Sequence, residues 1–201
     1  MTLALIDYGA GNLTSVRKGF VAAGAELQSP RIPADLSNCS GIVVPGVGHF
    51  GVTAALDDGW REAILRRVEA GVPLFGICLG MQWLYEGSEE APDVAGLGLV
   101  SMRCEKIVAE RPLKVPHVGW NSLKTLRPSV LLDGIADHAQ VYFTHTFAAP
   151  VTPDCVAWSE HGQPFAAVVE RGHVAGVQFH PEKSGDAGIR LLRNFIALSR
   201  K

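Results

Sequence analysis

The segment VPLFGICLGMQ constrains the fold most, because it changes from strand-like to helix-like sequence at a single residue. The apolar run at residues 72–77 predicts a buried strand, and residues 79–86 are rich in the helix formers Leu, Met, Gln and Glu. Cys78 lies at the junction, and Gly76 and Gly80 flank it. A G-x-C-x-G pattern is typical of a nucleophile elbow, where small neighbours are needed because the backbone is crowded. We therefore expect the sulfur to project from the end of a sheet.

This position suits a reactive cysteine for two reasons. The N-terminal end of a helix carries partial positive charge, which favours a thiolate over a thiol at Cys78. The backbone N–H of Leu79 is a first-turn donor, so it can bind the oxyanion that forms when sulfur attacks a carbonyl. A second donor is expected from the backbone of Val47 or Gly48, in the glycine-rich loop PGVGHFG.

A second segment, VQFHPEK, supplies the other groups of a cysteine hydrolase triad. Residues 175–179 predict a strand, and alternation along an extended chain places His180 and Glu182 on the same side. Pro181 favours an extended conformation at His180. We predict that His180 acts as general base toward Cys78 and then as general acid toward a leaving nitrogen, while Glu182 fixes its tautomer.

The order of the predicted elements indicates an α/β fold. In chain order, the first half is predicted to contain a strand at residues 3–6, a helix in which Leu13, Val16 and Phe20 recur at helical spacing, a strand at 41–44, a helix at 60–70 and a strand at 72–77. Such alternation implies an open, mostly parallel sheet with helices on both faces. Ligands bind at the carboxyl ends of the strands in such sheets, which is where Cys78 and His180 both fall.

The second half of the chain is richer in short β-type runs. These runs are 106–108, 118–123, 141–147 and 166–170. We expect them to extend the sheet with antiparallel strands. Apolar residues then recur at helical spacing from Ile189 to Ile196, which predicts a closing amphipathic helix.

Composition sets bounds that agree with this fold. A chain of 201 residues, with 47% hydrophobic and 19% charged residues and no evident linker, predicts a single domain over residues 1–201. A net charge of -2 gives no general attraction to nucleic acid or anionic membranes. The opening MTLALIDYG is too short an apolar run for a signal peptide, and no segment approaches the roughly 20 apolar residues of a membrane span. We therefore expect a cytoplasmic enzyme.

No cofactor, metal or disulfide is predicted. The four cysteines show no metal-ligand spacing, and Cys39, Cys104 and Cys155 are expected in the core. His138, His161 and His173 stand in polar or turn contexts and are expected at the surface.

One glycine pattern imitates a nucleotide-binding motif. Gly46, Gly48 and Gly51 satisfy G-x-G-x-x-G after a predicted strand, but the acidic residue expected about 20 positions later is missing. Arg66, within a predicted helix, stands in that region instead. The loop is better explained as the source of an oxyanion donor. Glycines on both sides of Val47 also leave its peptide free to rotate, so we expect a partner or substrate to order the oxyanion hole and to stimulate the reaction.

Taken in order, the motifs resemble those of the class I, or triad-type, glutamine amidotransferases. Within that class the chain is similar to the glutaminase subunits of imidazole glycerol phosphate synthase, in histidine biosynthesis. The matching segments are DYGAGNLTSV, PGVGHFG, GICLGMQWLYEGSEE, GLGLV, PHVGWN, YFTHTF and FHPEKSGDAG. They cover nearly the whole chain. The resemblance implies a flavodoxin-like α/β domain that releases ammonia from glutamine.

The resemblance also implies where glutamine binds. Gln82 would hold the amide end of the substrate, and Glu90 would receive its α-ammonium group. The backbone of His145, Thr146 and Phe147 would meet the amino-acid end. Phe147 stands where the family has a tyrosine, so a role for a side-chain hydroxyl is not expected there. The simpler alternatives are an ordinary helix residue for Gln82 and a solvated charge for Glu90.

A protein partner is implied in the same way. By resemblance it is a (β/α)₈ barrel cyclase subunit that forms a heterodimer with this chain. It would add the ammonia to a phosphorylated ribulosyl imidazole-carboxamide, yielding imidazole glycerol phosphate and an aminoimidazole carboxamide ribonucleotide. The implied interface and ammonia passage contain Asn12, Pro116, His117, Trp120 and Lys183. Here the simpler alternatives are a helix cap for Asn12, a core aromatic for Trp120 and a solvated charge for Lys183.

Two other classes of function stay open. One is another triad amidohydrolase, such as the glutaminase subunit of pyridoxal phosphate synthase or a stand-alone cysteine hydrolase, although PHVGWN and DYGAGN argue against it. The other is a non-catalytic glutamine-sensing or scaffolding protein, which the intact Cys78, His180 and Glu182 disfavour.

Overall fold

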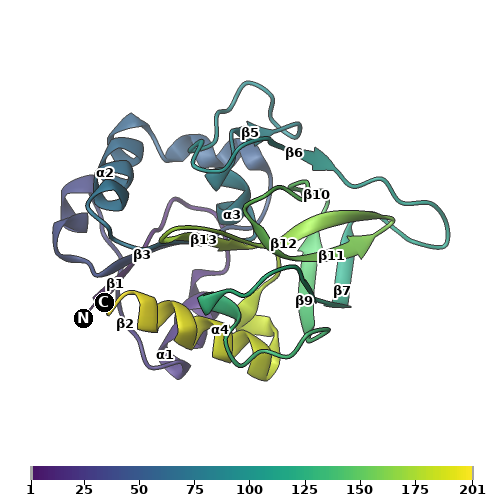
Figure 1. Ribbon diagram of the computed structural model, residues 1–201. Helices are drawn as coiled ribbons and strands as arrows, with labels where there is room; N and C mark the ends of the chain where they lie inside the picture. Colours follow the sequence, from purple (N-terminus) through teal and green to yellow (C-terminus); the bar gives the residue numbers. More distant parts are fainter. Residues whose placement is uncertain (1, 201) are drawn as a thin grey trace.

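The computed structural model describes residues 2–200, which form an α/β architecture (Figure 1). The strands are β1 (Thr2–Leu5), β2 (Glu26–Gln28), β3 (Gly41–Val44), β4 (Leu74–Ile77), β5 (Gly87–Ser88), β6 (Arg103–Lys106), β7 (His117–Ser122), β8 (Lys124–Thr125), β9 (Gln140–His145), β10 (Phe147–Ala148), β11 (Cys155–His161), β12 (Gln163–Arg171) and β13 (Val174–Val177). The α-helices are α1 (Leu13–Ala22), α2 (Asp58–Glu69), α3 (Leu79–Leu84) and α4 (Gly185–Leu198), and the 3₁₀ helices are η1 (Pro33–Asn38), η2 (Phe50–Ala55), η3 (Val130–Leu132) and η4 (Pro181–Lys183). No helix in this part of the chain is both long and apolar enough to cross a membrane.

One large sheet organises the molecule. Its strands lie in the order β2-β1-β3-β4-β13-β12-β11-β8. Neighbours are parallel from β2 to β13 and antiparallel from β13 to β8. The predicted fold class, an open and mostly parallel sheet with flanking helices and added antiparallel strands, is therefore confirmed.

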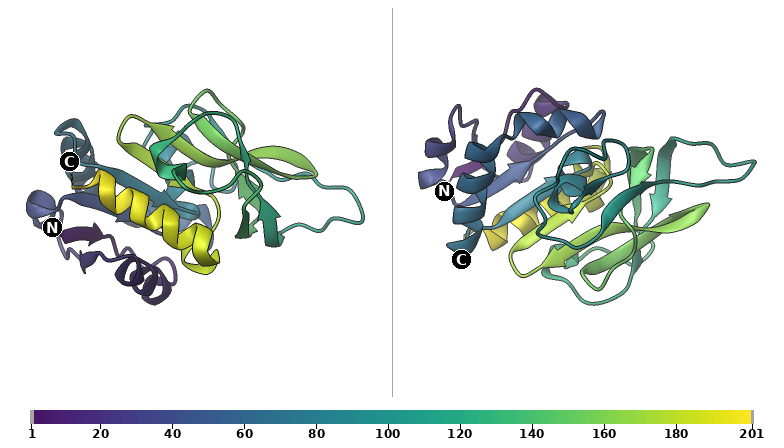
Figure 2. Two further views of the ribbon diagram at one scale, coloured as in Figure 1. Left: turned by 60° about the horizontal axis from the view of Figure 1, so that its bottom comes forward. Right: turned by 90° about the horizontal axis from the view of Figure 1, so that it is seen from above.

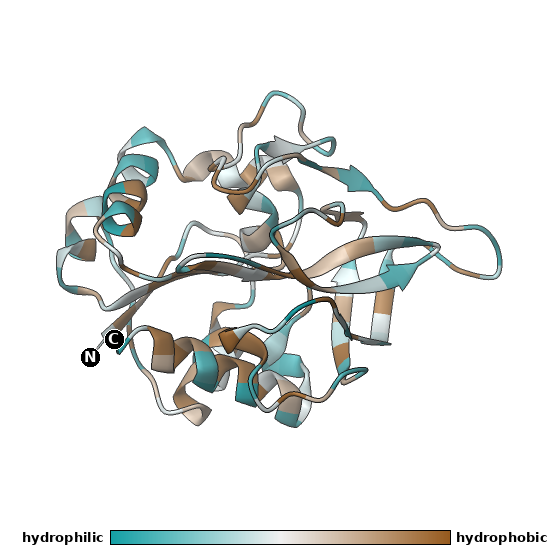
Figure 3. Cartoon of the chain, viewed as in Figure 1, coloured by the Kyte–Doolittle hydropathy of each residue, from teal (hydrophilic) through white to brown (hydrophobic). Residues whose placement is uncertain are grey.

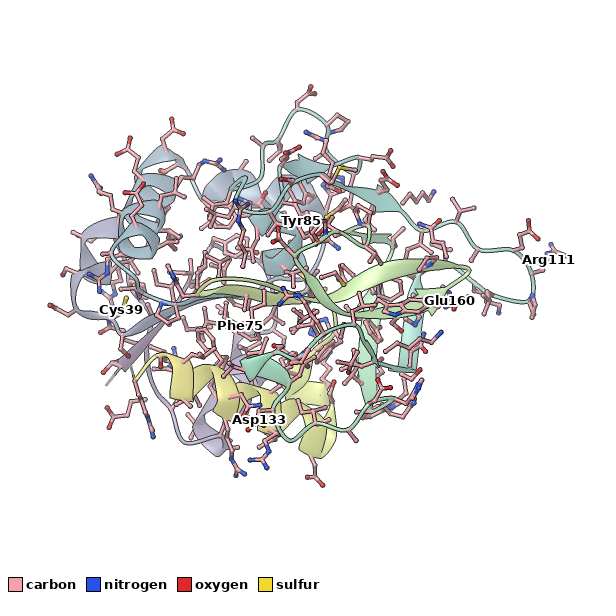
Figure 4. All side chains as sticks on the ribbon, in the orientation of Figure 1. Cys39, Phe75, Tyr85, Arg111, Asp133 and Glu160 are labelled. Atoms are coloured by element: carbon pink, nitrogen blue, oxygen red, sulfur yellow. The ribbon has the colours of Figure 1, made fainter. Side chains whose placement is uncertain are left out.

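Helices cover both faces of this sheet, α1 and α4 on one face and α2 and α3 on the other (Figures 1 and 2). Apolar residues concentrate between the layers (Figure 3). On the α4 side, Phe75 of β4 stacks on Phe195 with ring centroids 4.8 Å apart, and Phe20 of α1 meets both rings edge-on. Figure 4 shows Phe75 inside the molecule. Burying each such side chain stabilises the folded chain by roughly 1.5–3 kcal/mol, and this packing holds in place the strands that carry the site.

Two smaller sheets lie beside the antiparallel end of the large one. β7 pairs with β9, and β6 lies between β10 and β5. The segment between β6 and β7 projects away from the body, with Arg111 at its tip (Figures 1 and 4). The expectation that the late strands extend the main sheet is wrong for 106–108, 118–123 and 141–147, because β6 pairs with β5 and β10 and β7 pairs with β9.

Some boundaries differ from prediction because pairing with distant strands decides them. The predicted strand 141–147 is two strands, since the chain passes at Thr146 from the β7 sheet to the β6 sheet. The run 106–108 lies mostly outside its strand, which ends at Lys106 where pairing with β10 ends. Helix α3 ends at Leu84 rather than at residue 86, because Tyr85 is extended with φ -77° and ψ -178°.

Candidate active site

The sheet order brings the two predicted catalytic segments together. β4 and β13 are parallel neighbours, so the residues that follow them emerge at the same edge. The Cys78 N–H donates to the Val177 carbonyl at 2.7 Å, continuing the ladder to the base of the site. Segments about 100 positions apart in sequence thus meet because their strands are adjacent.

Cys78 has the strained backbone of a nucleophile elbow, with φ 52° and ψ -107° at the start of α3. The flanking glycines are required by space. A Cβ on Gly80 would lie 1.7 Å from the Val44 carbonyl oxygen, and one on Gly76 would lie 2.6 Å from the Gly80 oxygen. Only residues without side chains allow α3 to approach β3 this closely.

His180 and Glu182 form a buried pair in which His180 Nδ1 and Glu182 Oε1 are 2.9 Å apart. The expected contact is present, but its expected cause is wrong. β13 ends at Val177, and the two residues meet across the turn of η4 rather than along an extended strand. His180 itself remains extended before Pro181, with φ -100° and ψ 98°.

The surroundings of His180 favour its protonated form. Burial by itself lowers the pKa of this imidazole, but its interactions with Cys78 and Glu182 outweigh burial and raise the pKa to about 9. With Nδ1 committed to Glu182, Nε2 has no hydrogen-bond partner of ordinary geometry among residues 2–200. An imidazolium with a free Nε2 beside a cysteine can transfer a proton to or from a reacting group.

A pocket of about 290 Å³ opens onto Cys78. It is lined by Gly48, Cys78, Leu79, Gln82, Glu90, Pro116, Thr144, His145, Thr146 and Phe147. The structure therefore brings together the expected nucleophile and every expected glutamine contact. Val47 does not line the pocket, and Asn12, His117, Trp120 and Lys183 lie outside it.

Gln82 is buried, and its amide group is held firmly. Its Nε2 donates to the Phe147 carbonyl at 2.8 Å and to Gln178 Oε1 at 3.0 Å. Both N–H groups are therefore used within the protein, and Oε1 is the group left for a ligand. Glu90 is likewise more than a solvated charge, because its Oε2 accepts the Phe50 N–H at 2.7 Å.

The expected oxyanion donor at Leu79 is occupied. Its N–H donates to the Gly46 carbonyl at 3.2 Å, because the PGVG loop lies over the first turn of α3. Gly48 has a positive φ of 108°, a backbone conformation that favours glycine, and it lines the pocket. In this arrangement Leu79 does not present a free donor toward the pocket.

The residues expected at an interface divide into exposed and buried groups. Trp120 is 56% exposed, so it is not a core aromatic, and Pro116 and Lys183 are also exposed. Asn12 caps α1, its Oδ1 accepting the Ser15 N–H at 3.2 Å. His117 is buried, and its ring stacks on Phe143.

Two histidines, His117 on β7 and His145 at the end of β9, lie in contact, and the sequence did not predict this pair. His117 Nδ1 lies 3.1 Å from His145 Nε2, and His145 Nδ1 lies 3.0 Å from the Phe147 carbonyl. Burial, together with repulsion from His161, lowers the pKa of His117 to about 4, and burial, together with repulsion from His117, lowers the pKa of His145 to about 3. His161 also differs from its predicted surface position, because its half-buried ring stacks on His117 with centroids 4.2 Å apart.

Gln178, which follows β13, is the main site residue that sequence reasoning missed. It is fully buried and contacts both Gln82 and Cys78. Its available signal was a polar residue at the end of an apolar strand, two positions before His180. Within residues 2–200, no group of three or more His, Cys, Asp or Glu side chains is arranged to hold a metal ion. Cys39, Cys104 and Cys155 are buried free thiols, as expected.

Comparison with known proteins agrees with this geometry. The family described as "Glutamine amidotransferase class-I" matches residues 4–198. The chain is 42% identical to the imidazole glycerol phosphate synthase subunit HisH of Deinococcus radiodurans, over 95% of this chain and 91% of that protein. It is 44% identical to the HisH subunits of Xanthomonas oryzae (98% of each chain) and Natronomonas pharaonis (96% of this chain and 93% of that protein).

Solved structures share the fold at lower identity. A structure described as a glutamine amidotransferase has a TM-score of 0.76 at 21% identity, covering 98% of this chain and 99% of that chain. PurLQS from Thermotoga maritima also has a TM-score of 0.76, at 17% identity and covering 98% of this chain and 97% of that chain. The family match over nearly the whole chain and the identity to curated relatives together show that this chain is an enzyme of the class I glutamine amidotransferase family, among the HisH subunits of imidazole glycerol phosphate synthase.

Proposed function

We propose that this chain is a single glutamine amidotransferase domain that hydrolyses glutamine to glutamate and ammonia through Cys78, His180 and Glu182. One observation carries the proposal. A buried His180–Glu182 pair with atoms 2.9 Å apart interacts through His180 with an elbow cysteine that opens onto a pocket. This arrangement supports the roles of nucleophile, base and orienting carboxylate in acyl transfer.

The chemistry proceeds in two halves. The Cys78 thiolate attacks the carbon of the substrate amide, and His180 Nε2 gives its proton to the nitrogen, which leaves as ammonia. A water molecule then attacks the thioester, losing a proton to His180, and glutamate departs as the thiolate is restored. Glu182 keeps the ring oriented and stabilises the imidazolium. The raised pKa of His180, about 9, supports an imidazolium that is present at neutral pH.

Pocket chemistry supports glutamine as the substrate. Because both N–H groups of Gln82 are used inside the protein, its Oε1 can accept an N–H from the substrate amide. Glu90 keeps one carboxylate oxygen free of Phe50, and this negative charge suits the α-ammonium group. The backbone from His145 to Phe147 lines the same pocket and suits the amino-acid end.

Regulation follows from the oxyanion loop. Leu79 donates to Gly46, so stabilising an oxyanion requires the loop to release this N–H and to turn a donor of Val47 or Gly48 inward. Losing one such donor typically lowers a rate roughly 10²–10³-fold. We therefore propose that the isolated chain is slow and that its partner or the partner's ligand rearranges the loop.

The partner we propose is the cyclase subunit, a (β/α)₈ barrel that forms a heterodimer with this chain in the cytoplasm and receives its ammonia. The support comes from the HisH relatives, which are subunits of a synthase. Exposed Pro116, Trp120 and Lys183 suit the interface, and Asn12 offers its side chain at the start of α1. A docked partner would keep ammonia from escaping into water and becoming protonated.

The test is glutamate release by the wild-type chain and by Cys78→Ala, each with and without the cyclase and its ribonucleotide ligand. We expect Cys78-dependent release that rises sharply with the liganded cyclase. Release that depends on Cys78 but does not change when the cyclase is added would support the catalytic triad and contradict the proposed partner. No release from a folded complex would overturn the catalytic role, leaving a non-catalytic subunit.

A further inference from the structure

The side-chain amide of Gln178 contacts the sulfur of Cys78. Gln178 Nε2 lies 3.6 Å from Cys78 Sγ, within hydrogen-bond range for a sulfur acceptor, and Gln178 is fully buried. Gln178 is thus a second side-chain N–H donor at this sulfur, besides the His180 imidazole that interacts with Cys78. The catalytic roles assigned to the triad do not explain why a buried amide lies against the nucleophile.

A fixed backbone acceptor determines the orientation of this amide. The Phe147 carbonyl can only accept, so the Gln82 atom 2.8 Å from it must be Nε2. The second N–H of Gln82 then points to Gln178 at 3.0 Å, so the Gln178 atom there must be Oε1. Gln178 is thereby left with its NH₂ group facing Cys78. Gln82 therefore donates both to the Phe147 carbonyl and to Gln178, and Gln178 in turn donates to the sulfur.

This arrangement distinguishes the two ionisation states of Cys78. As a thiol, the sulfur donates weakly to the Thr144 carbonyl, 3.9 Å away. As a thiolate it has no proton to donate, whereas the Gln178 N–H can still donate to it, and more strongly because the acceptor is charged. A hydrogen bond to the charged form favours that form.

We propose that Gln178 is a positioning residue that stabilises the Cys78 thiolate, with its amide oriented by Gln82 and the Phe147 carbonyl. The inference rests on the proposed function only in that Cys78 is the nucleophile. It assigns Gln82 a second task besides contact with substrate, namely to prevent the Gln178 amide from turning its oxygen toward the sulfur.

The test is the pH profile of Cys78 alkylation by iodoacetamide in the isolated chain, followed by mass spectrometry of the Cys78 peptide. Gln178→Met keeps the length of the side chain and removes the donor. We expect its alkylation at neutral pH to be roughly tenfold slower, as for the loss of one hydrogen bond to an ionised group, with the midpoint of the profile moved to higher pH. Rates should converge with those of wild type at alkaline pH, where both sulfurs are ionised.

Two further variants identify the cause. Gln82→Met frees Gln178 to turn, so it should shift the profile in the same direction by a smaller amount. Gln28→Met, a half-buried glutamine on edge strand β2, is the matched control and should leave the profile unchanged. A folded Gln178→Met chain with the wild-type profile would overturn the proposal.

A measurement on the wild-type chain keeps the test decisive if Gln178→Met fails to fold. The side-chain NH₂ signals of Gln178 should move with the ionisation of Cys78 in a pH titration followed by NMR, and should lose that response in Cys78→Ala. Gln178 NH₂ signals that do not change as Cys78 ionises would contradict the proposal. Because neither assay needs glutamine or a partner, failure to hydrolyse glutamine would count against the proposed function and leave this result standing.

Discussion

At the scale of single residues, all four cysteines are buried, and the surroundings of each sulfur separate them by reactivity. Burial raises the pKa of Cys155 to about 11, and it raises the pKa values of Cys39 and Cys104 above their ordinary range. These three side chains are therefore thiols at neutral pH, and the thiolate is the reactive form. Cys78 differs because it begins α3, opens onto the pocket and accepts the Gln178 N–H.

We predict that limiting iodoacetamide at pH 7.5 labels Cys78 roughly a hundredfold faster than any other cysteine. Peptide mass spectrometry at short reaction times gives the site, and Cys78→Ser is the control in which fast labelling should disappear. Equal labelling of Cys155 in the folded chain would show that position and burial do not set reactivity here.

At the scale of elements, the approach of α3 to β3 depends on one missing side chain. A Cβ at Gly80 would lie 1.7 Å from the Val44 oxygen, so Gly80→Ala must separate the helix from the strand that precedes the oxyanion loop. We predict a loss of about 3 kcal/mol or more in the free energy of unfolding, measured by urea denaturation. Gly172→Ala, where φ is 63° and nothing lies within 4 Å of the new atom, should cost only about 1 kcal/mol through backbone strain. Equal losses for the two variants would contradict the steric explanation.

Helices and strands whose own sequence has a clear hydrophobic pattern were predicted well. Strands whose existence depends on pairing with a segment far away in the sequence were not. Strand β3 and helices α1 and α4 follow from apolar spacing between turn residues. β11 and β2 were not predicted, and the sheet switch at Thr146 depends on which distant strand each short run meets. The site divides in the same way. The elbow and the His180–Glu182 contact lie within short motifs, whereas the Gln82–Gln178 bond joins residues 96 positions apart.

At the scale of the whole molecule, histidines set opposing pH limits on stability. His117 and His145 have pKa values of about 4 and 3 in the folded chain, so the unfolded chain binds more protons below pH 6.5, and stability falls as the pH drops. The pKa of His180 is about 9, so its contribution is complete below pH 6.5 and is lost as the pH rises through 9.

We therefore predict that the histidine contribution to the free energy of unfolding is largest near pH 6.5. Urea midpoints measured from pH 4 to pH 10 test this, with the His180 contribution on the order of 3 kcal/mol. His180→Gln should flatten the alkaline decline and leave the acid decline in place. An unchanged alkaline decline in His180→Gln would mean that another group controls it.

The antiparallel end of the molecule exposes apolar side chains that the proposed partner could cover. Val118 and Trp120 on β7 are 57% and 56% exposed, and the neighbouring projecting segment exposes Val108 and Leu113 (Figure 1). A large exposed aromatic residue among aliphatic ones is typical of an interface anchor.

We predict that Trp120→Ala weakens binding of the cyclase by roughly 2 kcal/mol, about thirtyfold, measured by calorimetry. Ile32→Ala removes an equally exposed apolar residue before η1, at the other end of the sheet, and should leave the affinity unchanged. Because Trp120 does not line the pocket, alkylation of Cys78 in the isolated variant should match wild type while partner-stimulated glutamate release at limiting cyclase falls. Equal affinities for Trp120→Ala and wild type would place the partner on another face.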